Sequence, residues 1–492
     1  MSEDKVRVKV TKVLLESERQ ELKANRRRKL LIGLLCFLFL VVGAASGFVA
    51  SGLLKGTNVA IFRKDKLDKI NAYFDSVWLY KNDYENLADT MEDKAFYGMT
   101  RFEEDPYTTY MSKDELAEFA SRINNNYVGI GAQYTYSDGC GTITRVFKQS
   151  PAEKGGLMPG DIIYKVNNEL LDGLTADDIK EKITGEEGSE VKVTVLRSGK
   201  EIELTFIRGA IDYTAYGEKY DDYAYLNIMS FGETTADECV KYLDECTDYS
   251  KLIIDLRDNT GGYQDSVQSV AGLFLGKNVV VLNETDNTGE TKSYETIVSK
   301  YYKNFDKIVV LINENTASAA EVLSIALKEQ HQDCTLVGTT TYGKGVVQTS
   351  YALEDGSALK VTTSYWTSPN GVSINGDGVK PDIEIKLDDI LYENVYNMEE
   401  EDSFEFDSVS NYIKIAQKGL KYLGYELNRV DGYFDKSFIN ALKQYKINNS
   451  LEVNETLDNN TYSAIVSSVI REYNTNKDKD LQLQKAIEVL GK

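Results

Sequence analysis

The sequence predicts an α/β core with a mixed sheet and flanking helices, joined to a small β-rich domain and further helical segments. Three observations support this fold class. Between residues 210 and 386, apolar strand-like runs alternate with helical runs, as in a parallel or mixed sheet covered by helices. Between residues 128 and 208, short β-branched runs alternate with glycine-rich turns. A chain of 492 residues also exceeds what one hydrophobic core supports, so several domains are expected.

The amino-terminal residues predict a membrane anchor. Residues 30–54 contain no charged side chain, and a run of that length spans a bilayer. Four basic residues at 26–29 precede it directly, so the positive-inside bias predicts that residues 1–29 form a basic cytoplasmic tail and that the chain after Lys55 lies outside the cell. A cleaved signal peptide is the alternative, because small residues follow the apolar run. The length of the run favours a retained, single-pass transmembrane helix.

The later boundaries follow changes of pattern. Residues 60–125 predict a helical region with a turn at residues 105–106, and these helices could form a homodimer. Within the β-rich domain, the segment TADDIKEKI predicts one helix with Thr175 as its N-cap. An acidic stretch at 399–407 predicts a linker. The expected order after the anchor is the helical region at 60–125, the β-rich domain at 126–208, the α/β core at 209–398, a small helical module at 405–470 and a C-terminal helix at 471–492.

The distribution of charge argues against nucleic acid as a partner. The chain carries a net charge of -22. Residues 1–29 carry ten basic and five acidic residues, so the remainder is more acidic still. A body this acidic does not hold a phosphate backbone by charge.

The histidine and cysteine content argues against a metal site. His331 is the only histidine, which excludes a zinc site built on two or three imidazoles. Four cysteines are scattered outside the apolar run and form no CxxC pair, so we expect free thiols. Neither a metal nor a cofactor is expected. His331 lies in the polar segment KEQHQD and is expected at the surface, so acyl-transfer chemistry would need another base.

A serine and a lysine are the candidates for that chemistry. Ser318 follows a predicted buried strand and begins a predicted helix, whose free N–H groups would favour a nucleophile beside an oxyanion hole. Lys344 lies between two glycines, and burial would lower its pKa enough for a neutral amine to act as a base. Gln348 is four residues later, so it could share a face with Lys344 and orient the amine. Each feature alone also fits an ordinary cap, loop or turn.

Four segments follow one another along the chain: DLRDNTGG, NENTASAAE, TTYGKGVVQ and DGSALKVTTSYWTSPNGVSINGDGVKPDI. In this order they resemble the carboxy-terminal processing (tail-specific) protease family, which joins a PDZ domain to a Ser/Lys peptidase core. The resemblance implies that Ser318, three residues before Glu321, is the nucleophile, with Lys344 as its base and Gln348 beside it. It also implies an oxyanion hole made by the backbone N–H groups of Gly262 and Ala319.

The same resemblance implies that residues 126–208 are a PDZ domain. Its carboxylate-binding loop would be Val128, Gly129, Ile130 and Gly131, and substrates would be proteins with a free C-terminus. Two departures from the family pattern stand out. Thr184 replaces an arginine that precedes a glycine in the family, and the interval between Ser318 and Lys344 is one residue longer than usual.

The helical module resembles a peptidoglycan-binding module. The segments LKYLGYELNRVDGYF, INALKQYKINNSL and LDNNTYSAIV carry this resemblance, although the usual Phe-Gln pair is absent near residues 445–446. It implies cell-wall peptidoglycan as a partner and a Gram-positive bacterium as the source. A helical cap or a dimer element of the peptidase is the alternative.

These features together predict a membrane-anchored, extracytoplasmic serine endopeptidase. It would recognise protein C-termini through the PDZ domain and cleave through an acyl-enzyme formed by a Ser/Lys dyad. Two other functions stay open at this point. One is a non-catalytic PDZ scaffold at the cell wall, and the other is a wall-binding tether.

Overall fold

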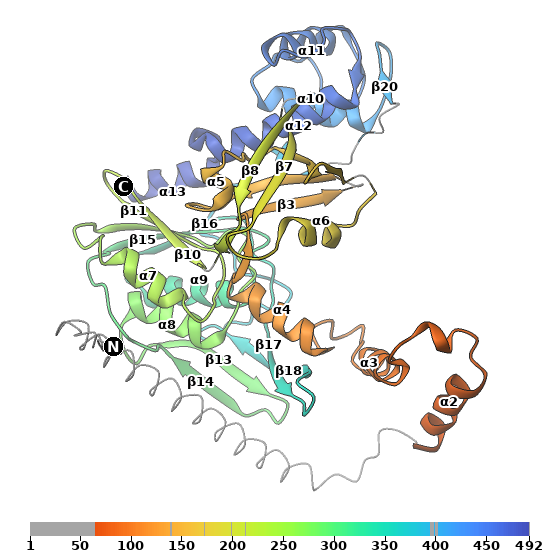
Figure 1. Ribbon diagram of the computed structural model, residues 1–492. Coiled ribbons are helices and arrows are strands. Elements are labelled where there is room, and N and C mark those ends of the chain that lie inside the picture. The colour runs from red at the N-terminus through yellow and green to blue at the C-terminus, as the bar shows by residue number, and fades with distance from the viewer. Residues whose placement is uncertain are drawn as a thin grey trace, which may run out of the picture. The chain divides into compact units, whose positions relative to one another are not determined.

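The computed structural model describes residues 64–137, 140–171, 173–197, 199–211, 213–393, 398 and 402–491 (Figure 1). The predicted cytoplasmic tail and transmembrane helix lie outside this part of the chain. Across the described residues, no helix is both long and apolar enough to cross a membrane. The chain divides into two compact units, Met1–Met91 and Glu92–Lys492.

The region predicted to be helical is mostly helical. It contains α2 (Lys64–Val77), the short 3-10 helix η2 (Lys81–Asp83), α3 (Leu87–Met99) and α4 (Lys113–Ile123). Ser112 and Glu115 form a reciprocal capping box at the start of α4. The short strand β1 (Thr109–Met111), which pairs with a strand of the α/β core, was not predicted.

A six-stranded sheet forms the centre of the α/β core, as predicted. Its order is β10-β11-β12-β15-β16-β19, with β10 antiparallel to β11 and the other neighbours parallel. The strands are β10 (Ala215–Lys219), β11 (Ala224–Ile228), β12 (Lys251–Asp255), β15 (Lys307–Ile312), β16 (Cys334–Gly338) and β19 (Ile383–Glu384).

Both faces of this sheet are covered. Leu252 and Ile254 of β12 pack into the cluster formed with helices α7 (Thr235–Leu243), α8 (Gln264–Leu275) and α9 (Ala319–Gln330). The residue between them, Ile253, packs with α13 (Leu481–Gly491) on the other face. This alternation explains why the strands read as continuous apolar runs in the sequence.

A second sheet lies within the same core. It has the order β1-β18-β13-β14, and β17 also pairs with β18. Its strands after β1 are β13 (Val280–Asp286), β14 (Thr291–Glu295), β17 (Val346–Ala352) and β18 (Ala358–Thr367). A shift in register between Val347 and Gln348 interrupts the pairing of β17 with β18.

The β-rich domain has its own core and an open sheet of order β3-β4-β5-β7-β8, with β6 paired to β5. Thr175 caps α6 (Ala176–Ile183) and forms a capping box with Asp178, which confirms the predicted N-cap. The remaining elements are β2 (Tyr127–Gly129), β3 (Ala132–Ser137), β4 (Cys140–Val146), α5 (Pro151–Lys154), β5 (Ile162–Val166), β6 (Glu169–Leu170), β7 (Glu190–Arg197), β8 (Lys200–Ile207) and β9 (Gly209–Ile211).

The C-terminal module is built from α10 (Asn411–Tyr422), α11 (Lys436–Asn448) and α12 (Asn459–Thr475). Phe434, Phe438, Tyr445 and Tyr462 are fully buried in its core. Helix α12 continues past residue 470, where the sequence analysis ends the module. The remaining short elements after the core are η3 (Asp389–Tyr392), β20 (Ser403–Phe404), which lies in the acidic stretch and pairs with β21 (Leu457–Asp458), and η4 (Lys477–Lys479).

Candidate active site

Ser318 lies at the turn between β15 and α9 and is the N-cap of the helix. Its backbone has φ 56° and ψ -121°, in the positive-φ region that residues other than glycine rarely occupy. Such strain costs about 1–3 kcal/mol and persists only where the surrounding structure imposes it. A sharp turn from strand to helix is also the geometry that presents a nucleophilic serine at a helix N-terminus.

The buried carboxylate of Glu321 joins the serine turn to the lysine loop. Its Oε2 accepts hydrogen bonds from the backbone N–H groups of Ser318 (2.8 Å) and Lys344 (2.9 Å). Its Oε1 accepts from the Gly343 N–H (2.7 Å) and the Thr341 hydroxyl (2.5 Å). The side chain is fully buried, so these four donors replace water around the carboxylate. The sequence analysis named Glu321 only as part of a motif and gave it no role.

Replacement of Glu321 by glutamine is expected to destabilise the core. An amide has only one acceptor oxygen, so at least two of the four donors would face an NH2 group and lose their partner. We expect the free energy of unfolding to fall by about 2–4 kcal/mol, since hydrogen bonds to buried charged groups are strong. Thermal unfolding and amide hydrogen exchange at Gly343 and Lys344 would measure this.

Glu314→Gln is the matched control for that variant. Glu314 is exposed and accepts one hydrogen bond, from the Thr339 hydroxyl (2.7 Å). Its replacement should leave stability and exchange close to those of the wild type. Equal behaviour of the two variants would contradict a joining role for Glu321.

Lys344 is half-buried in the loop before β17. Burial and repulsion from Lys360 lower the pKa of its amine to about 8, although attraction to Glu321 opposes this shift. The indole Nε1 of Trp366 donates to the Lys344 carbonyl (2.8 Å) and holds the backbone of the loop. The amine Nζ lies 4.8 Å from the centroid of the Tyr107 ring. Among the described residues, no hydrogen bond joins the side chains of Ser318 and Lys344.

Gly261 and Gly262 run directly against the serine turn. A Cβ at Gly261 would lie 2.8 Å from Ser318 Cβ, so the close approach requires glycine. Phe231 holds the pair from the other side, because its N–H donates to the Gly261 carbonyl (3.0 Å). The N–H groups of Gly262 and Ala319 donate to no acceptor in the described part of the chain.

Among the described residues, no hydrogen bond joins the Gln348 side chain to the Lys344 amine. The Gln348 Nε2 donates instead to the Thr362 hydroxyl, at a long distance of 3.4 Å. The expectation of a shared face assumed a regular helix or strand from residue 344 to residue 348. Lys344 precedes β17, and the shift in register at Val347–Gln348 interrupts the regular alternation of side chains along the strand.

His331 is remote from the serine. It caps the C-terminal end of α9, whereas Ser318 caps the N-terminal end. At about 1.5 Å per residue, the two lie roughly 20 Å apart along the helix. The imidazole Nδ1 accepts a hydrogen bond from the Asp333 N–H (3.2 Å). A pair formed by this serine and this histidine is excluded by the helix between them.

Of the predicted carboxylate-binding loop, Val128 and Gly129 belong to β2, and Ile130 and Gly131 connect this strand to β3. Val128 pairs with Ala210 of β9, and the buried Ile130 carbonyl accepts from the Ala152 N–H (2.7 Å). Gly131 has φ 82°, and a Cβ there would lie 2.4 Å from Ser150 Cβ. The structure therefore brings Val128, Gly129, Ile130 and Gly131 together at the start of the edge strand β3.

Two arginines near this domain were not singled out from the sequence. Arg145 of β4 donates to the Asn227 side chain of β11 (2.9 Å) and to the Tyr216 hydroxyl of β10 (3.2 Å), so it connects the β-rich domain to the central sheet. Arg208 donates to the Ile183 carbonyl (2.8 Å) and holds the turn that follows α6. No local pattern distinguishes either residue, because their partners are distant in the sequence.

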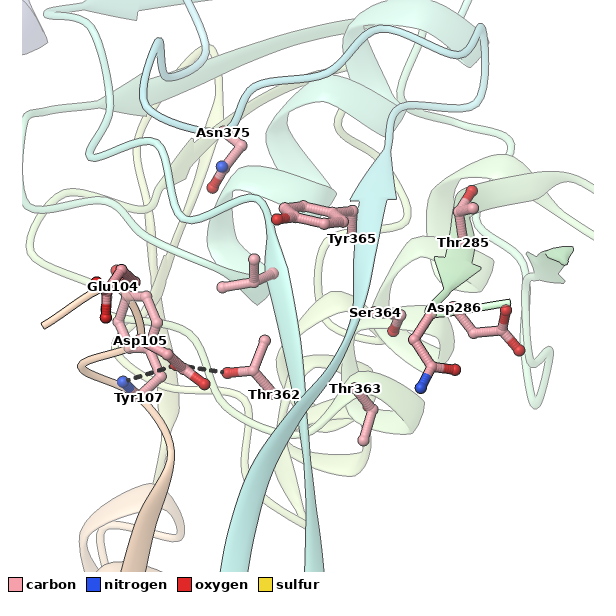
Figure 2. A pocket seen from close by; sticks show the side chains of 12 residues that line it. Glu104, Asp105, Tyr107, Thr285, Asp286, Thr362, Thr363, Ser364, Tyr365 and Asn375 are labelled. Carbon is pink, nitrogen blue, oxygen red and sulfur yellow. Dashed lines mark hydrogen bonds between the residues drawn. The ribbon is translucent and has the colours of Figure 1, made fainter. Parts of the chain in front are cut away.

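A cavity of about 340 Å³ lies beside the lysine loop (Figure 2). Its volume is at the lower end of the range for small-ligand pockets, about 300–1,000 Å³. The lining includes three carboxylates and no lysine or arginine. The cavity is lined by Glu104, Asp105, Tyr107, Thr285, Asp286, Asn287, Val346, Thr362, Thr363, Ser364, Tyr365 and Asn375. Tyr107 belongs both to this lining and to the surroundings of Lys344.

Comparisons with known proteins define the class. Residues 222–385 match the model of peptidase family S41, and residues 142–197 match that of the PDZ domain. Residues 410–465 match the model described as "Putative peptidoglycan binding domain". The fold and the matched families define a serine-type peptidase that carries PDZ and peptidoglycan-binding domains.

Relatives place the chain within that class. Carboxy-terminal processing protease CtpA of Bacillus subtilis (strain 168) is 32% identical over 477 residues, which cover 95% of this chain and 99% of the relative. The "Probable CtpA-like serine protease" of Staphylococcus haemolyticus (strain JCSC1435) is 30% identical over 467 residues, 93% of each chain. The solved photosystem II D1 C-terminal processing protease is 24% identical, with a TM-score of 0.42, and the match covers 64% of this chain and 88% of that one. The chain belongs to the carboxy-terminal processing protease family, within peptidase family S41.

Proposed function

We propose that the protein is a membrane-anchored, extracytoplasmic endopeptidase in which Ser318 is the nucleophile and Lys344 is the general base. The observation that carries this proposal is the Glu321 carboxylate, which hydrogen-bonds the backbone N–H groups of both residues. One buried side chain thereby fixes the two loops to each other. The lowered pKa of Lys344 supports the role of base, because a neutral amine is accessible near pH 8.

The proposed chemistry uses these residues in two stages. Neutral Lys344 Nζ accepts the proton of Ser318 Oγ as this oxygen attacks the scissile carbonyl carbon. The C–N bond then breaks, and the leaving amine takes that proton from the lysine. Water then attacks the resulting ester as Lys344 Nζ accepts its proton. The bond between the acyl carbon and Ser318 Oγ breaks, the new carboxyl group leaves, and the lysine returns the proton to Oγ. The free N–H groups of Gly262 and Ala319 would stabilise the oxyanion, each by about 3 kcal/mol at the transition state.

Substrate selection through the C-terminus is supported by the loop of residues 128–131. Backbone amides in such a loop can hold a carboxylate while the peptide extends the sheet at an open edge, here β3. Gln348 would contribute through Thr362 rather than through direct contact with the lysine.

Amidation of the substrate C-terminus is expected to lower kcat/KM for cleavage of an unfolded protein by about 10- to 100-fold. Loss of the negative charge removes charge-assisted hydrogen bonds worth about 1.5–3 kcal/mol. The effect should fall mainly on KM, because the reacting groups are unchanged. Paired substrates with a free and an amidated C-terminus would measure it.

A short peptide that spans the scissile bond but is too short to reach the loop at residues 128–131 is the control, and its cleavage should not depend on amidation. Equal cleavage of both long substrates would contradict recognition of the C-terminal carboxylate by this loop. Such a result would leave the Ser/Lys chemistry untouched.

Anchoring and wall binding complete the proposal. The uncharged run at residues 30–54 supports a single-pass anchor with an internal N-terminus, and the domain at 410–465 supports binding to peptidoglycan. A Gram-positive cell envelope would suit both, and a homodimer through the helices at 65–123 would be compatible with them.

In fractionated cells, we expect the protein in membranes and its release when residues 30–54 are deleted. Recovery of the intact protein in the soluble fraction would contradict the anchor.

A further inference from the structure

The Lys344 amine faces an aromatic ring. Its Nζ lies 4.8 Å from the centroid of the Tyr107 ring, within the distance of a cation–π contact. Within the described residues, the amine makes no hydrogen bond. The charged groups that act on it are Lys360 of β18, which repels it, and Glu321 of α9, which attracts it. The Tyr107 ring is therefore a group that the amine contacts in this structure.

The backbone around Tyr107 is fixed to β18 by hydrogen bonds (Figure 2). Asp105 Oδ1 accepts from the Tyr107 N–H (3.2 Å) and from the Thr362 hydroxyl (2.9 Å). The Thr362 N–H in turn donates to the Thr108 hydroxyl (3.0 Å). Desolvation acts against the charged form of Asp105, but the hydrogen bonds from Thr108 and Thr362 outweigh it and lower the pKa of this carboxyl.

The same threonine receives the hydrogen bond from Gln348. The Gln348 amide donates to Thr362 Oγ1 (3.4 Å), and that hydroxyl donates to Asp105. A continuous path thus runs from Gln348 through Thr362 and Asp105 to the backbone of Tyr107. It offers Gln348 a way to act on the lysine without touching it.

The Tyr107 ring is suited to hold a cation. Burial and the neighbouring Tyr342 hydroxyl raise the pKa of Tyr107 to about 12, so the phenol stays neutral over the range in which a peptidase is assayed. A neutral ring presents the negative face of its quadrupole to the ammonium. Tyr107 also lines the cavity, so a substrate that enters the cavity meets the residue that contacts the base.

We propose that Tyr107 is a positioning residue for Lys344: its ring face seats the ammonium, and Asp105, Thr362 and Gln348 hold that ring in place. The inference rests on the proposed function, in which neutral Lys344 is the base. The ring stabilises the protonated amine, whereas burial and Lys360 favour the neutral one. The cation–π contact with Tyr107 therefore determines both the position of the amine and the pH at which the amine becomes neutral and can act as a base.

The test compares Tyr107→Leu with Tyr107→Phe in the full-length protein, with kcat/KM measured on an unfolded substrate from pH 6 to pH 10. Leucine keeps apolar bulk but removes the quadrupole, so the rising limb should move to lower pH by about 0.5 to 1 unit. The loss of orientation should also lower the plateau by about tenfold. Phenylalanine keeps the ring, so its limb and plateau should stay near those of the wild type.

Two further variants make the outcome decisive. Tyr351→Leu, on the exposed end of β17 and outside the cavity lining, is the matched control and should not shift the limb. Thr362→Val keeps the ring but breaks the path to Asp105, and it should move the limb in the same direction as Tyr107→Leu by a smaller amount. It also allows the test if Tyr107→Leu unfolds.

An unchanged limb in both Tyr107→Leu and Thr362→Val would overturn this inference. The proposed function fails in a different way, through retained activity of Lys344→Ala. If Lys344→Ala is inactive while Tyr107→Leu and Thr362→Val keep the wild-type pH profile, Lys344 is the base and only the positioning role of Tyr107 is contradicted.

Discussion

Ser318→Ala is expected to lower kcat for cleavage of an unfolded protein by about 10⁴- to 10⁶-fold. Removal of Oγ leaves no atom to form the acyl-enzyme, whereas the oxyanion N–H groups and the binding surfaces stay intact. KM should therefore change little. Single-turnover cleavage with excess enzyme would measure the loss, and mass spectrometry of the wild type would find the acyl group on this serine.

Ser324→Ala is the matched control for the nucleophile. Ser324 is a buried serine of the same helix, and its hydroxyl donates to the Ala320 carbonyl (2.7 Å). This variant should keep wild-type kcat, with at most a small loss of stability. Substantial activity in purified Ser318→Ala, free of other proteases, would remove Ser318 from the mechanism.

Lys344→Ala is expected to lower kcat by about 10⁴-fold, because the proposed mechanism contains no other base. In the wild type, activity should rise with pH through an apparent pKa of about 8, since only the neutral amine accepts the Ser318 proton. The sign is that of a base: below this pH the amine is protonated and inactive. A pH profile of kcat/KM from pH 6 to pH 10 would measure the limb.

Lys360→Met provides an internal check on that limb. Lys360 is one of the groups that lower the pKa of Lys344, so loss of its charge should move the limb to higher pH. The plateau at high pH should persist. The assignment of Lys344 as the base would be contradicted if kcat/KM fell rather than rose with pH near pH 8. It would also be contradicted if the rise occurred at the same pH in Lys360→Met as in the wild type.

Much of the fold follows from local sequence pattern. The apolar runs of β12 and β15 predict buried strands, and the serine after β15 predicts the start of a helix because both signals are contiguous in the chain. The capping role of Thr175 is equally local. Where one short segment contains the whole physical cause, the sequence is sufficient to predict the structure.

Features that depend on distant partners could not be predicted in this way. Tyr107 meets Lys344 only because β1 pairs with β18, and a three-residue strand inside a helical region gives no periodic signal. The hydrogen bond from Gln348 to Thr362 was not predicted, because a break in strand register cannot be read from residue spacing. Glu321 has four donors from two loops, and only folding brings those loops together.

The helix that covers the second face of the central sheet has a consequence for biosynthesis. Helix α13 packs on Ile253, Val309 and Leu311, and Asp480 just before it pairs with Arg257 (2.9 Å), in the loop that leads to Gly261. On the ribosome these last residues emerge after every strand of the sheet has been made. Until then the sheet exposes an apolar face and the glycine loop lacks its partner. The α/β core is therefore complete only after α13 has been synthesised and has packed on this face of the sheet.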